Sequence, residues 1–100
     1  MQFSLNEYLE ELRPLINVDC GTYMTDGIKF IASQFEEKYR AMPGWSVKHI
    51  DCGKAGLGLE VRNKPETEHI DVMLIGHMDT VFPVGTAELR PMSQDAEKAY

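Results

Sequence analysis

The most constraining feature of the sequence is an apolar run, residues 70–75, which ends at Gly76 and leads directly into a His-x-Asp motif. A run rich in β-branched and long aliphatic residues predicts a strand that is buried on both faces. Ligands of open α/β sheets bind just beyond the carboxyl ends of such strands. His77 and Asp79 follow the run at this end, so we expect them to belong to a functional site.

The spacing of His77 and Asp79 suits a metal ligand and its supporting group. Side chains two residues apart in an extended chain point to the same side, so the Asp79 carboxylate can reach one nitrogen of the imidazole. This contact sets the tautomer and leaves the other nitrogen available to a metal. Gly76 predicts a turn or a close backbone approach. Taken alone, a polar pair of this kind is more often a simple hydrogen bond at a strand end.

The N-terminal residues predict a helix. Ser4 and Glu7 match a capping box, and Pro14 is expected to end or kink the helix near its C-terminus. The apolar residues recur at helical spacing, which predicts one core-facing side. This face consists of Leu5, Tyr8, Leu9, Leu12, Leu15 and Ile16.

A second helix is predicted to begin at Thr22 or Thr25, either of which can cap it, and to stop at residues 43–44, Pro-Gly. Glu36 and Arg40 are one turn apart and are expected to pair. Its apolar face consists of Met24, Ile28, Ile31, Phe35, Tyr39 and Met42.

The alternating patterns of residues 45–50 and 56–62 predict two adjacent antiparallel strands. Residues 80–86 read as a loop, because Pro83 excludes a central strand there. Residues 90–92 and 98–100 are expected to begin a short strand and its return. Together with the helices, these strands predict an α/β fold with a mixed sheet on which both helices pack.

Charge and length exclude several classes of protein. The formal net charge of -6 disfavours nucleic acids and anionic membranes as partners, because no basic stripe is present. The start of the chain does not resemble a secretory signal and no run is long enough to span a bilayer, so a cytoplasmic protein is expected.

Cys20 and Cys52 lack metal-site spacing and are expected to be reduced thiols. His49 and His69 do not follow strand ends and are weaker ligand candidates than His77.

The motif resembles that of a known family. Residues 76–83 resemble the first metal-binding motif of the co-catalytic zinc peptidases and deacylases, which include aminoacylase, acetylornithine deacetylase and the glutamate carboxypeptidases. Residues 85–91 make the glutamate carboxypeptidase branch the most similar, and residues 12–17 and 21–22 extend the resemblance over nearly the whole chain. The motif reads Gly76-His77-Met78-Asp79-Thr80-Val81-Phe82-Pro83.

The resemblance implies a three-layer α/β/α catalytic domain and a metallopeptidase or amidohydrolase with two zinc ions, for which cobalt and other divalent metals are alternatives. His77 matches a metal ligand, and Asp79 matches the catalytic-site carboxylate that orients it. The implied substrates are small peptides with a C-terminal glutamate or N-acyl amino acids. The implied lid or dimerisation domain is compatible with a homodimer.

The same resemblance implies that residues 1–100 are the N-terminal portion of the catalytic domain, without the lid domain and the C-terminal half. A catalytic zinc needs three protein ligands, and His77 supplies one. We therefore expect the isolated chain to be inactive and to bind zinc weakly. The alternative is a non-catalytic α/β module or a decayed gene product, in which His77 and Asp79 only hydrogen-bond to each other. A metal-bridging aspartate after Tyr100 would discriminate between the two.

Overall fold

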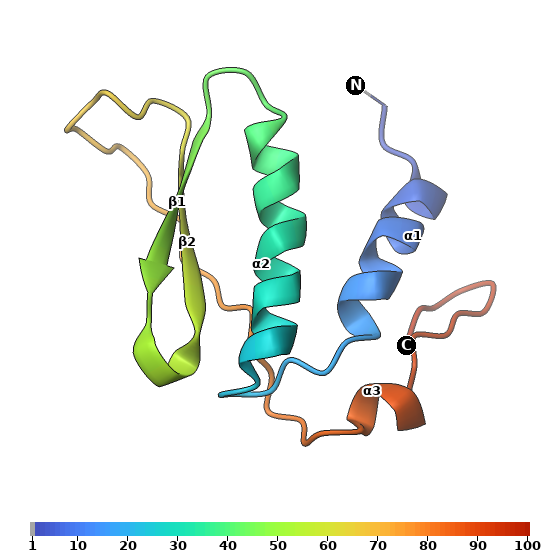
Figure 1. The fold of residues 1–100 in the computed structure, drawn as a ribbon. Coiled ribbons are helices and arrows are strands. Elements are labelled where there is room, and N and C mark those ends of the chain that lie inside the picture. The colour runs from blue at the N-terminus through green and yellow to red at the C-terminus, as the bar shows by residue number, and fades with distance from the viewer. Residues whose placement is uncertain (1) are drawn as a thin grey trace.

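The computed structural model describes residues 2–100 and arranges two long helices and a hairpin in sequence order, followed by a short helix near the C-terminus (Figure 1). The elements are α1 (Leu5–Ile16), α2 (Thr25–Arg40), β1 (Ser46–Asp51), the 3-10 helix η1 (Gly53–Ala55), β2 (Leu57–Arg62) and α3 (Thr86–Leu89). The structure is therefore of mixed α and β type, as the sequence predicts at this coarse level.

The helix α1 begins as predicted, because the Ser4 hydroxyl accepts a hydrogen bond from the amide of Glu7 at 3.3 Å. It continues through Pro14 and ends two residues later, where Asn17 donates its amide to the carbonyl of Arg13. Proline is tolerated here because it removes only one hydrogen bond from the last turn.

The predicted core-facing side of α1 is only partly covered, so that expectation was too strong. No residue of α1 is buried, and Leu5, Tyr8 and Ile16 are exposed. The reason is the order of the layers. The hairpin packs against α2, and α1 lies on the other side of α2, away from the sheet (Figure 1). A pair between Lys38 and Glu11, 2.9 Å apart, links the two helices.

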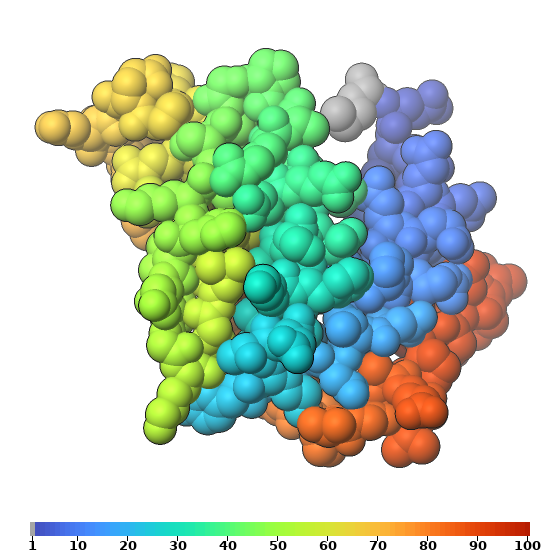
Figure 2. All heavy atoms as spheres, viewed as in Figure 1, coloured from blue at the N-terminus to red at the C-terminus, as the bar shows by residue number. Residues whose placement is uncertain are grey.

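The helix α2 separates the hairpin from α1, and its atoms occupy the space between them on the face shown in Figure 2. Thr25 is its first residue, and neither predicted threonine caps it, because Met24 holds the N-cap position without a side-chain hydrogen bond. The predicted Glu36–Arg40 pair is present at 2.9 Å. The small hydrophobic core lies at the N-terminal half of α2 and contains Cys20, Ile28 and Ile31, with Leu15, Val18 and Met78 packed against it.

The strands β1 and β2 pair antiparallel, as predicted, from Ser46 opposite Arg62 to Asp51 opposite Leu57. Within residues 2–100 they form a two-stranded sheet, so the mixed sheet is not seen. A second local pairing joins residues 93–95 to 98–100, through hydrogen bonds between Ser93 and Tyr100 and between Asp95 and Lys98. A short pairing is thus present near the expected return at residues 98–100, but residues 90–92, where the strand was expected to begin, have no strand assignment, and the bridge joins Gln94 to Ala99.

The predicted buried strand at residues 70–75 is wrong for this structure. The segment has no strand assignment, and Leu74 and Ile75 are 92% and 88% exposed. Among the described residues, no backbone–backbone hydrogen bond involves residues 70–79. An apolar pattern specifies which residues prefer burial, but a strand also needs a neighbour to accept and donate its backbone hydrogen bonds. No such neighbour lies beside it within residues 2–100.

The described helices also bear on membrane insertion. Within residues 2–100, none combines the length and the apolar character that crossing a bilayer requires.

Candidate functional site

The loop that carries His77 and Asp79 is attached to the rest of the chain at Thr80. The Thr80 amide donates to the carbonyl of Cys20 at 2.9 Å, and the Thr22 amide donates to the carbonyl of Thr80 at 3.1 Å. These bonds form a parallel bridge between Gly21 and Thr80. The two segments therefore meet just before α2, at the edge of the hydrophobic core.

Glycine is required at position 21 for this approach. A Cβ atom there would lie 2.6 Å from the carbonyl oxygen of Phe82. By contrast, nothing lies within 4 Å of a Cβ built on Gly76, and its φ is not in the left-handed region. The close approach expected at Gly76 is therefore absent, and Gly21 is the glycine that lets the site segment pack closely.

His77 and Asp79 contact each other in the predicted way. The Nδ1 atom of His77 lies 3.1 Å from Oδ1 of Asp79 and 2.8 Å from the Asp79 backbone oxygen. Both partners are acceptors, so Nδ1 must carry the proton that it donates to them. In the neutral imidazole, Nε2 then holds the lone pair. The His77 side chain is 82% exposed, which leaves Nε2 accessible to a ligand.

Thr22 completes the arrangement, and sequence reasoning missed its role. Its hydroxyl donates to Oδ2 of Asp79 at 2.7 Å, so Thr22 and His77 hold the two carboxylate oxygens. The hydrogen bond from Thr22, followed by that from His77, lowers the pKa of Asp79. Asp79 is therefore ionised at neutral pH. Thr22 and Asp79 are 57 residues apart, and no spacing pattern in the sequence connects them.

The chain contains a second His-x-Asp motif that provides an internal comparison. His69 contacts Oδ1 of Asp71 through Nε2 at 2.7 Å, which is the opposite ring nitrogen from that used by His77. Asp71 is 86% exposed, whereas Asp79 is 36% exposed and is also held by Thr22. The same spacing thus gives a solvated local pair at one position and an oriented pair at the other.

His49 is engaged elsewhere. Its Nε2 atom contacts Oε2 of Glu36, which also pairs with Arg40. The contact with His49, and then that with Arg40, lowers the pKa of Glu36. His49 therefore belongs to a surface hydrogen-bond network that joins α2 and β1.

The donors present fit one ligand position of a zinc site. A neutral imidazole with a carboxylate on its other nitrogen is the usual form of a zinc-bound histidine. No group of three or more His, Cys, Asp or Glu side chains that could hold a metal ion occurs in the described part of the chain. His77 is thus a suitable single ligand, with Asp79 and Thr22 as its supports.

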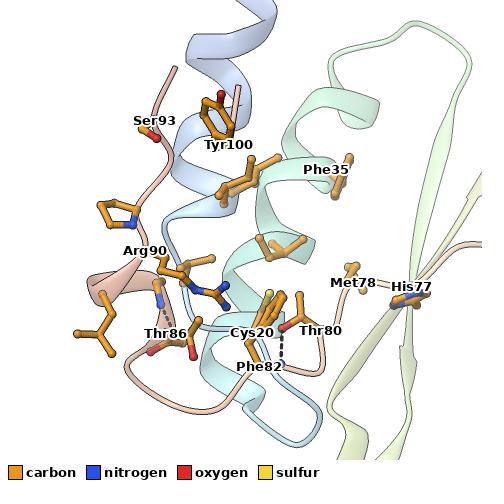
Figure 3. A pocket seen from close by; sticks show the side chains of 18 residues that line it. Cys20, Phe35, His77, Met78, Thr80, Phe82, Thr86, Arg90, Ser93 and Tyr100 are labelled. Atoms are coloured by element: carbon orange, nitrogen blue, oxygen red, sulfur yellow. Dashed lines mark hydrogen bonds between the residues drawn. The ribbon is translucent and has the colours of Figure 1, made fainter. Parts of the chain in front are cut away.

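A cavity of about 860 Å³ opens beside this pair (Figure 3). His77 and Met78 lie at one end, and Ser93 and Tyr100 lie at the other. Most of its lining is apolar, from α1, α2 and the segments around α3, and Arg90 also lines it. Cys20 contributes to the wall, but burial raises the pKa of its thiol, so it is protonated at neutral pH and is a poor nucleophile.

Comparison of the chain with known proteins identifies no relative. No protein-family model matches the chain, and neither the search of curated proteins nor that of solved structures finds a match. The functional proposal therefore rests on the residues, their geometry and the resemblance of the motif at residues 76–83.

Proposed function

We propose that residues 1–100 form the N-terminal part of a three-layer α/β/α catalytic domain of a two-metal amidohydrolase or peptidase. His77 serves as a zinc ligand through Nε2, and Asp79 orients it. The observation that supports this most is the pair of acceptors on Nδ1, which holds the proton there and leaves the lone pair on the exposed Nε2. The resemblance of residues 76–83 to the first metal-binding motif of the family supports the same role.

The chain's own residues act by orientation. Thr22 fixes Oδ2 of Asp79, and Asp79 keeps the proton of His77 on Nδ1. An ionised carboxylate in this position also makes the imidazole a stronger donor to a cation. When bound, zinc supplies Lewis acidity that polarises an amide carbonyl and lowers the pKa of water. The remaining ligands and the general base belong, by the resemblance, to later parts of a complete enzyme.

The substrate proposal follows the glutamate carboxypeptidase branch: a small peptide with a C-terminal glutamate, or an N-acyl amino acid. The apolar cavity beside His77 is compatible with the acyl or side-chain portion of such a molecule. The same resemblance supports an enzyme that dimerises through a further domain, with cobalt as an alternative metal.

Zinc titration of the 100-residue chain tests the metal role directly. Structural zinc sites bind with roughly 10–16 kcal/mol over about four ligands, so one ligand provides about 2.5–4 kcal/mol and a Kd of about 1–15 mM. Imidazole ¹⁵N spectra at pH 7 should show a saturable change at Nε2 of His77 in this range. His77→Ala should abolish it, and the matched variant His69→Ala should leave it unchanged. An equal response at His69 and His77 would contradict the proposal.

The protein from its natural source tests the whole-enzyme part of the proposal. We expect an intact mass far above that of the chain, together with metal-dependent hydrolysis of N-acyl glutamate that the isolated chain lacks. A natural mass equal to that of the chain would favour a non-catalytic module or decayed product. Efficient metal-dependent hydrolysis by the isolated chain would show that the missing ligands are not needed.

A further inference from the structure

Residues 19–22 lie in the connection between α1 and α2 and support the loop that carries the candidate metal ligand, and we refer to them as the anchor segment. At the C-terminal end of this segment, the Thr22 hydroxyl donates to Oδ2 of Asp79 at 2.7 Å. The Thr22 amide also donates to the carbonyl of Thr80 at 3.1 Å. These contacts locate the Asp79 carboxylate, which in turn contacts Nδ1 of His77.

At its N-terminal end, the anchor segment holds the same loop a second time. Asp19 is half-buried, and its two carboxylate oxygens accept hydrogen bonds from the amides of Gly85 at 2.8 Å and Ala87 at 3.0 Å. The amide of Ala87, and then that of Gly85, lowers the pKa of Asp19, so this carboxylate is ionised at neutral pH. The amides lie 66 and 68 residues further along the chain, so they are held by a tertiary contact and not by a local turn.

The two contacts restrain each other, because Asp19 and Thr22 are only three residues apart. Between them the two backbones touch, since a Cβ atom on Gly21 would lie 2.6 Å from the carbonyl oxygen of Phe82. Hydrogen bonds to an ionised carboxylate are stronger than those between neutral groups. The contacts of Asp19 therefore help to keep the Thr22 hydroxyl within reach of Asp79.

We propose that Asp19 is a positioning residue of the candidate metal site, which acts through Thr22 and Asp79 to keep the proton of His77 on Nδ1. The inference rests on the proposed function, in which His77 binds zinc through Nε2. Metal ligands depend on such outer partners for their orientation. The alternative is that Asp19 only caps the short helix α3 and stabilises the fold, in which case the His77 imidazole does not respond to its replacement.

A double-mutant cycle on the 100-residue chain separates these two roles. The ratio of the Nδ1–H to the Nε2–H tautomer of His77 is measured from imidazole ¹⁵N shifts, without zinc, at a pH at which the ring is neutral. Asp19→Asn keeps the shape of the side chain but leaves one acceptor oxygen in place of two. We expect the ratio to fall about threefold, as for the loss of one net hydrogen bond.

The second arm of the cycle tests the route through Thr22. Thr22→Val should lower the tautomer ratio at least as much as Asp19→Asn, and Asp19→Asn should lower it no further in the Thr22→Val background. Asp26→Asn is the matched control, because it makes the same charge change at an exposed position in the first turn of α2, and it should leave the ratio unchanged.

Three results would overturn the proposal: an unchanged ratio in Asp19→Asn, an equal fall in Asp26→Asn, or a further threefold fall in the double variant. A capping role alone would lower the free energy of unfolding and leave the ratio unchanged. Zinc titration of the same variants keeps the two proposals apart. The expected tautomer ratios without a zinc response at Nε2 would contradict the zinc-binding role of His77 alone, whereas a zinc response with an unchanged ratio would contradict the role of Asp19 alone.

Hydrogen exchange of the wild-type chain tests the coupling without any substitution. The amide of Thr80 donates to the anchor segment at Cys20, and the amide of Ala87 donates to it at Asp19. If the two contacts restrain each other, both amides open together, and their protection factors should agree within about tenfold. A larger difference would show that the contacts open separately and would overturn the proposal.

Discussion

Replacing Gly27 by alanine tests how α2 docks on the loop that precedes it. Gly27 is buried in the first turns of α2, and a Cβ atom there would lie 1.8 Å from the carbonyl oxygen of Asp19 and 2.8 Å from its carbonyl carbon. Real Cβ atoms do not approach closer than 3.0 Å, so the loop would have to retreat by 1.2 Å or more. The obstacle is backbone, which cannot rotate away as a side chain does.

The loop is also held from its other side. Asp19 accepts hydrogen bonds from the amides of Gly85 and Ala87, and the carbonyl of Cys20 accepts one from Thr80. Overpacking typically costs about 1–3 kcal/mol, and a backbone obstacle that is fixed from its other side places this case at the upper end, about 3 kcal/mol. Alanine regains about 1 kcal/mol over glycine in a helix. The net destabilisation is therefore about 2 kcal/mol, or a decrease in Tm of about 8–16 °C for a domain of this size.

Thermal and urea unfolding followed by circular dichroism would measure this change at one fixed protein concentration. Gly76→Ala is the matched control, because nothing lies within 4 Å of the added Cβ atom. Its effect should stay within about 0.5 kcal/mol. An unchanged or higher Tm for Gly27→Ala would refute the described contact between α2 and the loop, because helix propensity alone makes the variant more stable.

Two further predictions concern the carboxylates that organise the site. Thr22→Val removes the hydroxyl that lowers the pKa of Asp79 most. The pKa of Asp79, measured from its carboxyl ¹³C resonance, should therefore rise toward its ordinary value. An unchanged pKa would mean that the hydroxyl does not hold Asp79. The amides of Ala87, and then of Gly85, lower the pKa of Asp19 in the folded state. Asp19 therefore contributes stability above its unfolded pKa near 3.9, and this contribution is lost as the pH falls through the folded pKa. Asp19→Asn should flatten the acid limb of the unfolding free energy measured between pH 2 and 7, and a limb of unchanged slope would count against this role.

The sequence predicts an interaction correctly when the two partners lie close together along the chain. The Glu36–Arg40 pair and the cap at Ser4 join residues within one helical turn, and both were predicted correctly. The hairpin of β1 and β2 was also predicted, because its strands are separated by only a short turn. The core-facing role of α1 was overestimated, because periodicity identifies an apolar face but does not state what covers it.

In the candidate site, too, the local contact was predicted from the sequence and the distant one was not. The contact between His77 and Asp79 is local, since alternation along an extended chain brings residues two apart to one side, and the sequence alone predicted it. His69 and Asp71 have the same spacing, so the sequence could not tell which pair is oriented. Thr22 makes that distinction, and only the bridge between Gly21 and Thr80 brings it to Asp79.

The sequence by itself therefore determined the two long helices, the hairpin and the His77–Asp79 pair, because each depends on neighbours within a few residues. Only the tertiary structure decided that Thr22 supports Asp79, that Gly27 and Gly21 permit close backbone approach, and that residues 70–75 are exposed. The physical reason is that backbone pairing and close packing need a partner from a distant part of the chain, and an apolar or polar pattern does not name that partner.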